Sequence, residues 1–484
     1  MTRCLRRFRW LPLLLPGVVA GCLDSGDAPF SSPDDVRHAY VVVGANGQAV
    51  ARAITAAGNC PAISIDGARP VPMSLRAPAA SLPPRPTAYD KHNTVPAVFP
   101  VTVCDTVLPA GARRAAIGAR SLPVPAPQPR RILLIGDTGC RMKASGDSGE
   151  FQACNDGLRW PFATVAFSAA AQAPDLVLHV GDLHYRESAC PPGDAGCQGS
   201  PFGFSWTSWE PDFFAPAAPL LAAAPWIFVR GDHETCDRAG QGWWRMIDPR
   251  PLVPGQDCND AANDDVGNYS EPYAVPFAGD SAFVVFDSSV VGNKKLKPSD
   301  AQFQLYRRQF ETAFSLGAPF ANAFFANHHP VLGYNSGGTT QAEPGNEALQ
   351  SVLETIVPGF LFPANVQAVL SGHVHLLQIV GYATGQPPTF IPGNGGTALV
   401  PNFTSYPKGD TPLPGAVVAS LLHAPTFGFM TLERAAPGWT LASYDRNGAL
   451  LTTCGVVAKK ATCSPATLPA GAAGGASAGY NPSF

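Results

Sequence analysis

Short apolar runs that end in acids or histidines constrain the fold of this chain more than any other feature. In Asp175-Leu-Val-Leu-His-Val-Gly-Asp-Leu-His-Tyr185, an apolar run leads directly into Gly181, Asp182, His184 and Tyr185. Such a run is typical of a strand that is buried on both faces. Ligands of open α/β sheets bind at the carboxyl ends of strands, so these polar residues are candidates for a functional site.

The same pattern occurs at four more places along the chain. Apolar runs precede acids or histidines at 131–135 (Asp137), 225–230 (Asp232, His233 and Glu234), 323–326 (His328) and 366–370 (His373 and His375). Helices are predicted over residues 160–172 and 299–315, and one further strand over residues 283–287. Strands that alternate with helices predict an α/β fold for this part of the chain.

The regions outside this pattern predict a separate organisation. Residues 39–121 contain short β-type runs between Gly, Pro and Asn turns, which indicates a small all-β domain. A proline-rich linker at 122–130 leads to the α/β domain at 131–460. The tail at 464–484 is rich in Gly, Ala and Ser and is expected to be disordered.

The first 22 residues are typical of an export signal, with four arginines followed by an apolar segment too short to span a bilayer. Val19-Ala20-Gly21-Cys22 resembles a bacterial lipoprotein box, which predicts a lipid anchor on Cys22 and a tether at 23–38. The alternative is an ordinary signal peptide that contains a cysteine. Either interpretation places the protein in the bacterial cell envelope or outside the cell.

Apart from Cys4 and Cys22, the chain has ten cysteines, an even number that favours disulfides in an exported protein. Proximity in the sequence suggests five pairs, although spacing alone does not determine connectivity: Cys60–Cys104, Cys140–Cys154, Cys190–Cys197, Cys236–Cys258 and Cys454–Cys463. A structural zinc site is the alternative, which the absence of any CxxC pair among them disfavours.

The charge pattern argues against a dedicated nucleic-acid-binding protein. The formal charge of −3 includes the four arginines of the leader, so the remainder carries about −7, with no basic run to bind phosphate backbones. No obligate protein partner is evident.

Five motifs in order carry a resemblance to a known family. They are Asp137-Thr-Gly139, Gly181-Asp182-Leu-His-Tyr185, Gly231-Asp232-His233-Glu234, His328-His-Pro330 and Gly372-His373-Val-His375. Over residues 131–396 the chain resembles the calcineurin-like metallophosphoesterase superfamily, and the motif forms look most like its purple acid phosphatase branch. The resemblance implies a four-layer α/β/β/α sandwich with a two-metal site at one edge.

The resemblance also implies a role for each ligand. Asp182 would bridge both metals, Asp137, Tyr185 and His375 would complete the first site, and Asp232, His328 and His373 would complete the second. Mixed carboxylate and imidazole ligands suit Zn, Fe or Mn, so iron with zinc or manganese is expected. A phenolate from Tyr185 would favour ferric iron; the alternative is a tyrosine that only packs beneath the site.

The same resemblance predicts catalysis by a metal-bound water that attacks as hydroxide. His233 would protonate the leaving oxygen or hold the phosphate, and Glu234 would orient His233 from behind. The superfamily normally has Asn at position 232, so Asp232 adds a negative charge that should repel substrate phosphate. A substrate histidine of some relatives has no evident counterpart; His184, His329 and Tyr334 are considered for that role but are expected to line the pocket.

Other residues near the motifs have more ordinary interpretations. Four tryptophans, Trp206, Trp209, Trp243 and Trp244, are expected to pack under long loops rather than line a substrate cleft. Four arginines lie near motif segments, and surface salt pairing is expected for most of them: Arg141, Arg186, Arg230 and Arg245.

Taken together, these features predict an exported dinuclear-metal phosphoesterase that acts on small phosphomonoesters. Phosphodiester or nucleotide hydrolysis is the alternative within the same class. A non-catalytic, metal-binding envelope lipoprotein is the alternative outside it, because Asp232 departs from the family pattern.

Overall fold

The computed structural model describes residues 31–85, 95–145, 148–407 and 409–468. The predicted signal segment, the first half of the tether (23–30) and most of the tail (469–484) lie outside these residues. Within the described parts of the chain, no helix has the length and apolar character needed to cross a bilayer.

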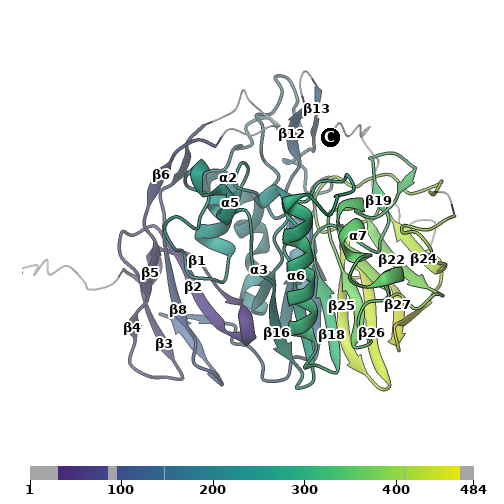
Figure 1. Cartoon of the computed structure of the whole chain (residues 1–484). Helices are drawn as coiled ribbons and strands as arrows, with labels where there is room; N and C mark the ends of the chain where they lie inside the picture. Colours follow the sequence, from purple (N-terminus) through teal and green to yellow (C-terminus); the bar gives the residue numbers. More distant parts are fainter. Residues whose placement is uncertain (1–30, 86–94, 146–147, 408, 469–484) are drawn as a thin grey trace, which may run out of the picture.

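Two large β-sheets form the centre of the molecule (Figure 1). The first has eleven strands, in the spatial order β28 (Lys460–Ser464), β27 (Leu450–Val457), β26 (Gly438–Asp445), β25 (Gly428–Ala435), β11 (Arg131–Ile135), β14 (Leu176–His179), β15 (Trp226–Phe228), β1 (Val36–Val43), β2 (Ala49–Thr55), β8 (Thr102–Val107) and β5 (Ser74–Ala77). The second has seven, in the order β16 (Tyr273–Phe277), β17 (Ser281–Val285), β18 (Asn322–Ala326), β21 (Val366–Leu370), β23 (Thr389–Pro392), β22 (Leu377–Tyr382) and β24 (Val418–Ala424).

Shorter elements surround these sheets. The small sheets are β10 (Arg120–Leu122), β9 (Ala115–Ile117), β3 (Ala62–Ile65) and β4 (Val71–Pro72); β12 (Met142–Ser145) and β13 (Ser148–Phe151); β19 (Asn335–Ser336) and β20 (Ala342–Glu343); and β6 (Ala80–Leu82) and β7 (Ala97–Phe99). The α-helices are α1 (Phe162–Ala170), α2 (Trp206–Trp209), α3 (Ala215–Ala223), α4 (Gly240–Gly242), α5 (Asp264–Gly267), α6 (Ala301–Gly317) and α7 (Glu347–Leu353).

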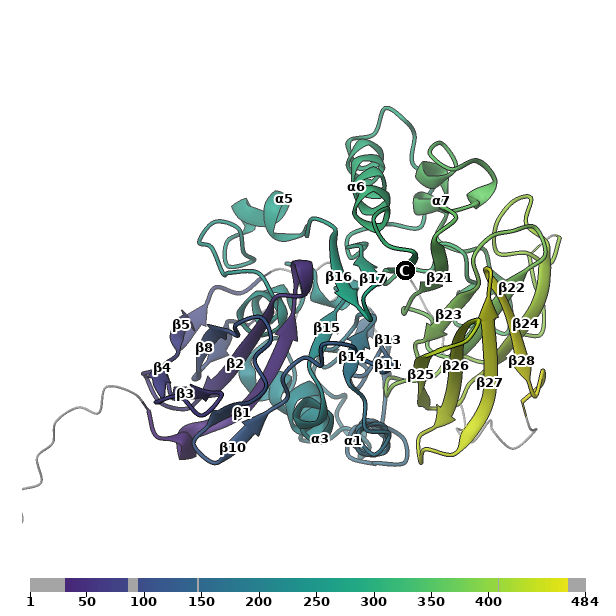
Figure 2. The same cartoon turned by 90° about the horizontal axis from the view of Figure 1, so that it is seen from below.

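The two sheets pack face to face, with helices on both outer sides. Figure 2 shows α6 and α7 on one side of the sandwich and α1 and α3 on the other. Along β11, Ile132 and Leu134 lie in the core between the sheets, whereas Leu133 and Ile135 lie in the core under α1 and α3. A strand buried on both faces has to be apolar at successive positions, which explains the continuous apolar run. The predicted four-layer α/β/β/α sandwich is confirmed.

Four strands of the N-terminal region belong to the first large sheet, in contrast to the expectation of a small all-β domain apart from the α/β domain. Strand β1 pairs in parallel with β15, with Val42 opposite Trp226, and β2, β8 and β5 extend the same sheet. Tyr40 and Val42 share a core with Trp226 and Phe228. The strand β1 also includes residues 36–38, which were expected to belong to the tether. Parallel pairing between segments so far apart in the sequence leaves no local signal.

All five disulfides suggested by proximity in the sequence are confirmed: Cys60–Cys104, Cys140–Cys154, Cys190–Cys197, Cys236–Cys258 and Cys454–Cys463. The alternative of a zinc site built from these cysteines is therefore wrong. Disulfides persist in oxidising compartments, which is compatible with export.

Candidate metal centre

The polar ends of five parallel strands meet at one edge of the sandwich. Strands β11, β14 and β15 lie side by side in the first sheet, and β18 and β21 pair in the second. The loops after them carry the predicted ligands. Because parallel strands end at the same edge, residues from distant parts of the sequence converge there.

The predicted ligands form two groups that share Asp182. Potential ligand atoms of Asp182, Asp232, His328 and His373 lie within 4.8 Å of one another, and those of Asp137, Asp182 and His375 do so as well. Asp182 therefore lies where a bridging carboxylate would be needed.

Histidine Nε2 atoms face the carboxylates in both groups. His328 Nε2 lies 3.2 Å from Asp182 Oδ2 and 3.2 Å from Asp232 Oδ1, while its Nδ1 lies 2.8 Å from the carbonyl oxygen of Val180. With Nδ1 donating to that carbonyl, Nε2 is the ring atom that a neutral His328 would offer to a cation. His375 has the same arrangement, with Nδ1 3.0 Å from the carbonyl of Ala398.

The Tyr185 hydroxyl points into the first group. It lies 2.7 Å from Asp182 Oδ2, 3.1 Å from Asp137 Oδ1 and 3.0 Å from His375 Nε2, and the side chain is fully buried. Burial and the carboxylates of Asp182 and Asp137 hold the pKa of Tyr185 well above its ordinary value. A cation at this point would act in the opposite direction and favour the phenolate.

The donor set fits two transition-metal ions. Asp137 and Asp182 are fully buried within one cluster, an arrangement that is costly unless a cation balances the charge. Burial raises the pKa of Asp137 well above its ordinary value, and the charge of Asp182 contributes to this shift. Carboxylate, imidazole and phenol donors together suit iron, zinc or manganese.

Backbone strain accompanies three of these residues. Asp137, Asp182 and His373 have φ angles of 56°, 60° and 69°, in the left-handed region that non-glycine residues seldom adopt. Such strain persists only when the surroundings enforce it. The packing at Asp182 is close, because a Cβ atom on Gly231 would clash with the Asp182 carboxylate and backbone nitrogen.

His233 lies beside the groups, and its carboxylate partner is Glu187. The imidazole Nε2 of His233 is 3.9 Å from Asp182 Oδ2, and its ring centroid is 3.8 Å from that of Tyr185. On the opposite side, His233 Nδ1 lies 2.9 Å from Glu187 Oε1. Burial and the charge of Arg238 lower the pKa of His233.

Glu234 has a different role from the one expected. Its carboxylate accepts hydrogen bonds from the backbone N–H groups of Gly231, Asp182, Leu183 and His184, at 2.8–3.2 Å. It therefore holds the loop that presents Asp182, and Glu187 takes the position behind His233. The expectation was wrong because four unpaired N–H groups of a tight loop form a stronger attraction for a buried carboxylate than one imidazole does.

Asp232 has a counter-charge that the sequence analysis missed. Arg238 donates from Nη1 to Asp232 Oδ2 at 2.6 Å and from Nε to Glu187 Oε1 at 2.6 Å. Burial alone would raise the pKa of Asp232, but hydrogen bonds from His328 and His373 and the charge of Arg238 hold it well below its ordinary value.

Asp212 is a third missed residue. It is fully buried and accepts the backbone N–H groups of Cys140 and Tyr185 at 2.7 Å, and Arg186 Nε at 3.0 Å. It thus ties together the loops after β11 and β14. A lone acid in an aromatic stretch carries no local signal for this role. For Glu187 and Arg238 the sequence carries a weak signal, because only 14% of the residues in this chain are charged and these two lie near motifs.

The three candidates for an additional substrate histidine lie in different places. His329 lies at the second group, with its ring centroid 4.3 Å from that of His373 and Nε2 4.0 Å from Asp232 Oδ1. His184 Nε2 lies 3.2 Å from Ser208 Oγ and Tyr334 donates to the carbonyl of Asp410 at 2.7 Å, so both are engaged elsewhere.

The tryptophans and arginines near the motifs are all buried. The expectation that the four tryptophans pack is confirmed, since each is at most 5% exposed. The expectation that most of the four arginines form surface salt pairs is wrong, because all four are buried and at most 8% exposed. Long loops cover these side chains, and loop packing is not evident from sequence.

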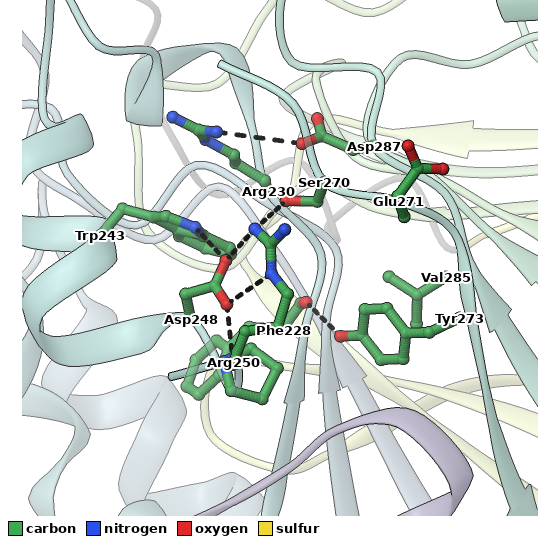
Figure 3. A pocket seen from close by; sticks show the side chains of 11 residues that line it. Phe228, Arg230, Trp243, Asp248, Arg250, Ser270, Glu271, Tyr273, Val285 and Asp287 are labelled. Carbon is green, nitrogen blue, oxygen red and sulfur yellow. Dashed lines mark hydrogen bonds and ion pairs between the residues drawn. The ribbon is translucent and has the colours of Figure 1, made fainter. Parts of the chain in front are cut away.

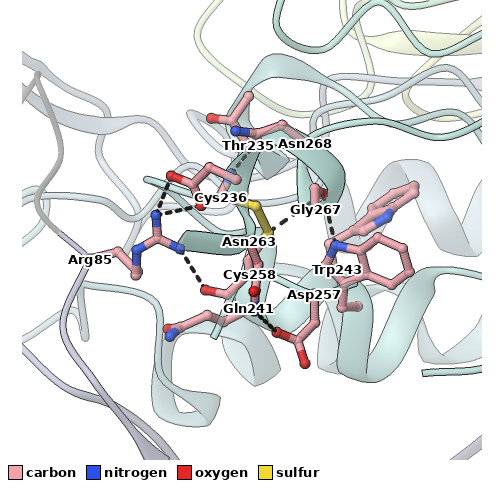
Figure 4. The surroundings of a disulfide bond; sticks show 12 residues. Arg85, Thr235, Cys236, Gln241, Trp243, Asp257, Cys258, Asn263, Gly267 and Asn268 are labelled. Atoms are coloured by element: carbon pink, nitrogen blue, oxygen red, sulfur yellow. Dashed lines mark hydrogen bonds and ion pairs between the residues drawn. A yellow bond between two sulfur atoms is a disulfide. The ribbon is translucent and has the colours of Figure 1, made fainter. Parts of the chain in front are cut away.

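A disulfide holds the loop that follows Asp232 and His233. Cys236 pairs with Cys258, Arg85 donates to the carbonyl of Cys258 at 2.6 Å, and Asn268 Oδ1 accepts the N–H of Cys236 at 2.7 Å (Figure 4). These contacts restrain the loop from its far side.

A small cavity behind the same loop contains none of the predicted ligands. Arg230, Asp248, Arg250 and Asp287 line it, and Asp248 bonds with Trp243 and Arg250 (Figure 3). Arg230 lies 4.0 Å from Asp287, and Arg250 pairs with Asp248, so these four charges support the loop rather than offering a second site.

Two solved structures resemble this chain. The purple acid phosphatase PPD1 from yellow lupin (Lupinus luteus) seeds is 14% identical, with a TM-score of 0.50 over 92% of this chain and 76% of its own. PhoD is 11% identical, with a TM-score of 0.49 over 90% of this chain and 92% of its own. No curated protein matches the sequence. At these identities the likeness concerns the fold alone.

The sequence itself matches the family model of the calcineurin-like phosphoesterases over residues 130–377. That match spans more than half of the chain and includes all of the residues that form the two groups around Asp182. The chain therefore belongs to the calcineurin-like phosphoesterase family, whose members are metal-dependent phosphoric ester hydrolases.

Proposed function

We propose that this phosphoesterase hydrolyses phosphomonoesters with two metal ions bound at the groups that share Asp182, iron with zinc or manganese. The observation that carries the proposal is the pair of overlapping ligand groups, Asp137–Asp182–His375 and Asp182–Asp232–His328–His373, with His233 beside them. Tyr185 is the further ligand that favours iron in the first group.

The residues around the groups have distinct tasks in this reaction. When bound, the two cations would hold the phosphate oxygens, neutralise their charge and activate water for in-line attack. His233, held through Nδ1 by Glu187, presents Nε2 on the side of Asp182, where the protonated imidazole can give its Nε2 proton to the leaving oxygen. Glu234 and Asp212 keep the loops that carry Asp182 and Tyr185 in place.

Turnover of two chromogenic esters tests the proposal. Protein loaded with Fe, Zn or Mn should hydrolyse p-nitrophenyl phosphate faster than bis-p-nitrophenyl phosphate. Asp182→Ala should lose both the two metal equivalents, measured by mass spectrometry, and the activity. Preference for the bis-ester would favour a phosphodiesterase, and turnover of neither ester under any metal would favour a non-catalytic metal-binding protein.

We also propose that the chain is exported and anchored through lipid on Cys22. Five disulfides support an oxidising compartment, and the Val19–Cys22 segment supports lipidation. Labelling with a radioactive fatty acid should mark the wild-type protein in a bacterial host and leave Cys22→Ser unlabelled. Equal labelling of both would contradict the anchor.

A further inference from the structure

Arg238 connects the unusual ligand Asp232 to His233. It is 1% exposed and donates to two carboxylates, Asp232 Oδ2 through Nη1 and Glu187 Oε1 through Nε, both at 2.6 Å. Glu187 in turn lies 2.9 Å from His233 Nδ1. Asp232, Arg238, Glu187 and His233 are thus linked by direct contacts from the second metal group to the proposed proton donor.

The two oxygens of Asp232 have different partners. Oδ1 lies 3.2 Å from both His328 Nε2 and His373 Nδ1, whereas Oδ2 is held by Arg238. A carboxylate with one oxygen held in this way offers a single oxygen to a cation, as an asparagine amide would. Arg238 also supplies the positive charge that offsets the extra negative charge of Asp232.

We propose that Arg238 is a positioning residue that allows Asp232 to occupy a ligand position normally taken by a neutral amide. It limits Asp232 to one ligand oxygen, offsets its charge so that anionic phosphate is still accepted, and links it through Glu187 to His233. The catalytic part of this role rests on the proposed function. Its test measures binding and stability rather than turnover.

The first test measures inorganic phosphate and Zn²⁺ binding by calorimetry in four proteins: wild type, Asp232→Asn, Arg238→Met and the double variant. Arg238→Met should bind phosphate about tenfold more weakly, since a positive charge next to the centre is lost. Asp232→Asn should bind phosphate more tightly and Zn²⁺ about tenfold more weakly, and the double variant should lie close to wild type. Unchanged phosphate and Zn²⁺ binding in Arg238→Met would overturn the proposal.

The second test compares thermal unfolding of the same four proteins in the presence of a chelator. Arg238→Met should lower the unfolding midpoint less in the Asp232→Asn background than in wild type. In wild type the substitution leaves the Asp232 carboxylate without its counter-charge, whereas in the Asp232→Asn background that carboxylate is absent. Strictly additive changes would show that the two residues do not act as a pair. Arg238→Lys, which keeps the charge, should restore most of the phosphate affinity.

A matched control is the ion pair between Arg52 on β2 and Asp105 on β8. Arg52 Nε lies 2.7 Å from Asp105 Oδ1, and the Arg52 side chain is fully buried. Arg52→Met should lower the unfolding midpoint and leave phosphate and Zn²⁺ affinities at wild-type values. If wild type shows the predicted binding pattern but hydrolyses no phosphate ester, the proposed function fails while the role of Arg238 stands.

Discussion

Two glutamates beside His233 illustrate how single residues divide the work at this centre. Glu187 contacts the imidazole, and Glu234 accepts the N–H groups of the loop that carries Asp182. Burial alone would raise the pKa of Glu187, but Arg238 and His233 hold it below its ordinary value, so it remains ionised at neutral pH. One carboxylate therefore contacts the proposed proton donor, and the other holds the loop that carries Asp182.

The two glutamates should respond differently to substitution by glutamine. Glu187→Gln should reduce kcat about 10- to 100-fold and keep both metal equivalents, because the Glu187 carboxylate contacts His233 and Arg238 rather than a ligand atom. Glu234→Gln should weaken metal binding, because only the oxygen of the amide can accept hydrogen bonds. Two of the four loop N–H groups would then face an NH₂ group instead of a carboxylate oxygen. Steady-state kinetics and metal analysis of both variants check this, and loss of metals in Glu187→Gln would contradict the assignment.

Tyr185 provides a spectroscopic prediction. If its oxygen binds ferric iron, iron-loaded protein should show a visible charge-transfer band that Tyr185→Phe lacks. Tyr334→Phe is the matched control, since Tyr334 is also buried but donates to the carbonyl of Asp410, and it should keep the band. A colourless iron-loaded wild type would leave Tyr185 as a packing residue.

At the scale of elements, buried carboxylates hold the ligand loops of the first sheet from behind. The loop after β15 is restrained by Cys236–Cys258 on one side and by the Asp248 cluster on the other. Asp248 is 1% exposed and accepts hydrogen bonds from Trp243 Nε1 at 3.0 Å and from Arg250 Nη2 at 2.7 Å. These contacts restrain the loop on both sides.

Asp248 should give a measurable pH dependence of stability. Burial alone would raise the pKa of Asp248, but Arg250 lowers it from 3.8 to about 2. A lowered pKa stabilises the fold above pH 4, and this contribution disappears as the pH falls through about 2. Asp248→Asn should therefore reduce the free energy of unfolding by about 2 kcal/mol at pH 7, and by progressively less between pH 4 and pH 2.

Urea unfolding of wild type and variant at several pH values checks this difference. Asp280 is the control, since its partner Arg434 and its own side chain are 49% and 40% exposed. Asp280→Asn should cost less than about 1 kcal/mol. A pH-independent difference for Asp248→Asn would show that packing, not charge, is what the substitution removes.

For the whole molecule, the N-terminal strands β1, β2, β8 and β5 extend the eleven-stranded sheet that contains β11, β14 and β15. They cover the edge of β15 and share its core, and Tyr40 and Arg52 both donate to the carbonyl of Met246, at 2.6 and 2.8 Å. The strand that presents Asp232 is therefore an interior strand only because β1 lies beside it.

Removal of residues 1–122 should accordingly prevent folding. The truncated chain would expose Trp226 and Phe228 together with the unpaired edge of β15, so we expect aggregation or a loss of cooperative thermal unfolding. A chain that begins at Ser31 keeps every described strand and should unfold like the full chain. A soluble 123–484 fragment with a wild-type midpoint would show that the two regions fold independently.

The sequence alone determined the local features of this protein. The apolar runs predicted buried strands, and the order of Asp137, Asp182, Asp232, His328 and His373 after them predicted a common edge, because the carboxyl ends of parallel strands coincide. Close spacing in an exported chain suggested the disulfide pairs. Each of these depends on residues near one another in the sequence or on a pattern that repeats.

Only the tertiary structure decided which charges meet. Glu187 rather than Glu234 contacts His233, Arg238 offsets Asp232, and β1 continues the sheet beside β15. The choice between two nearby glutamates depends on where loop N–H groups point, and the pairing of β1 depends on an open strand edge 184 residues away, as the partners Val42 and Trp226 show. Neither leaves a periodic or local pattern, because both are set by the packing of loops and sheets in three dimensions.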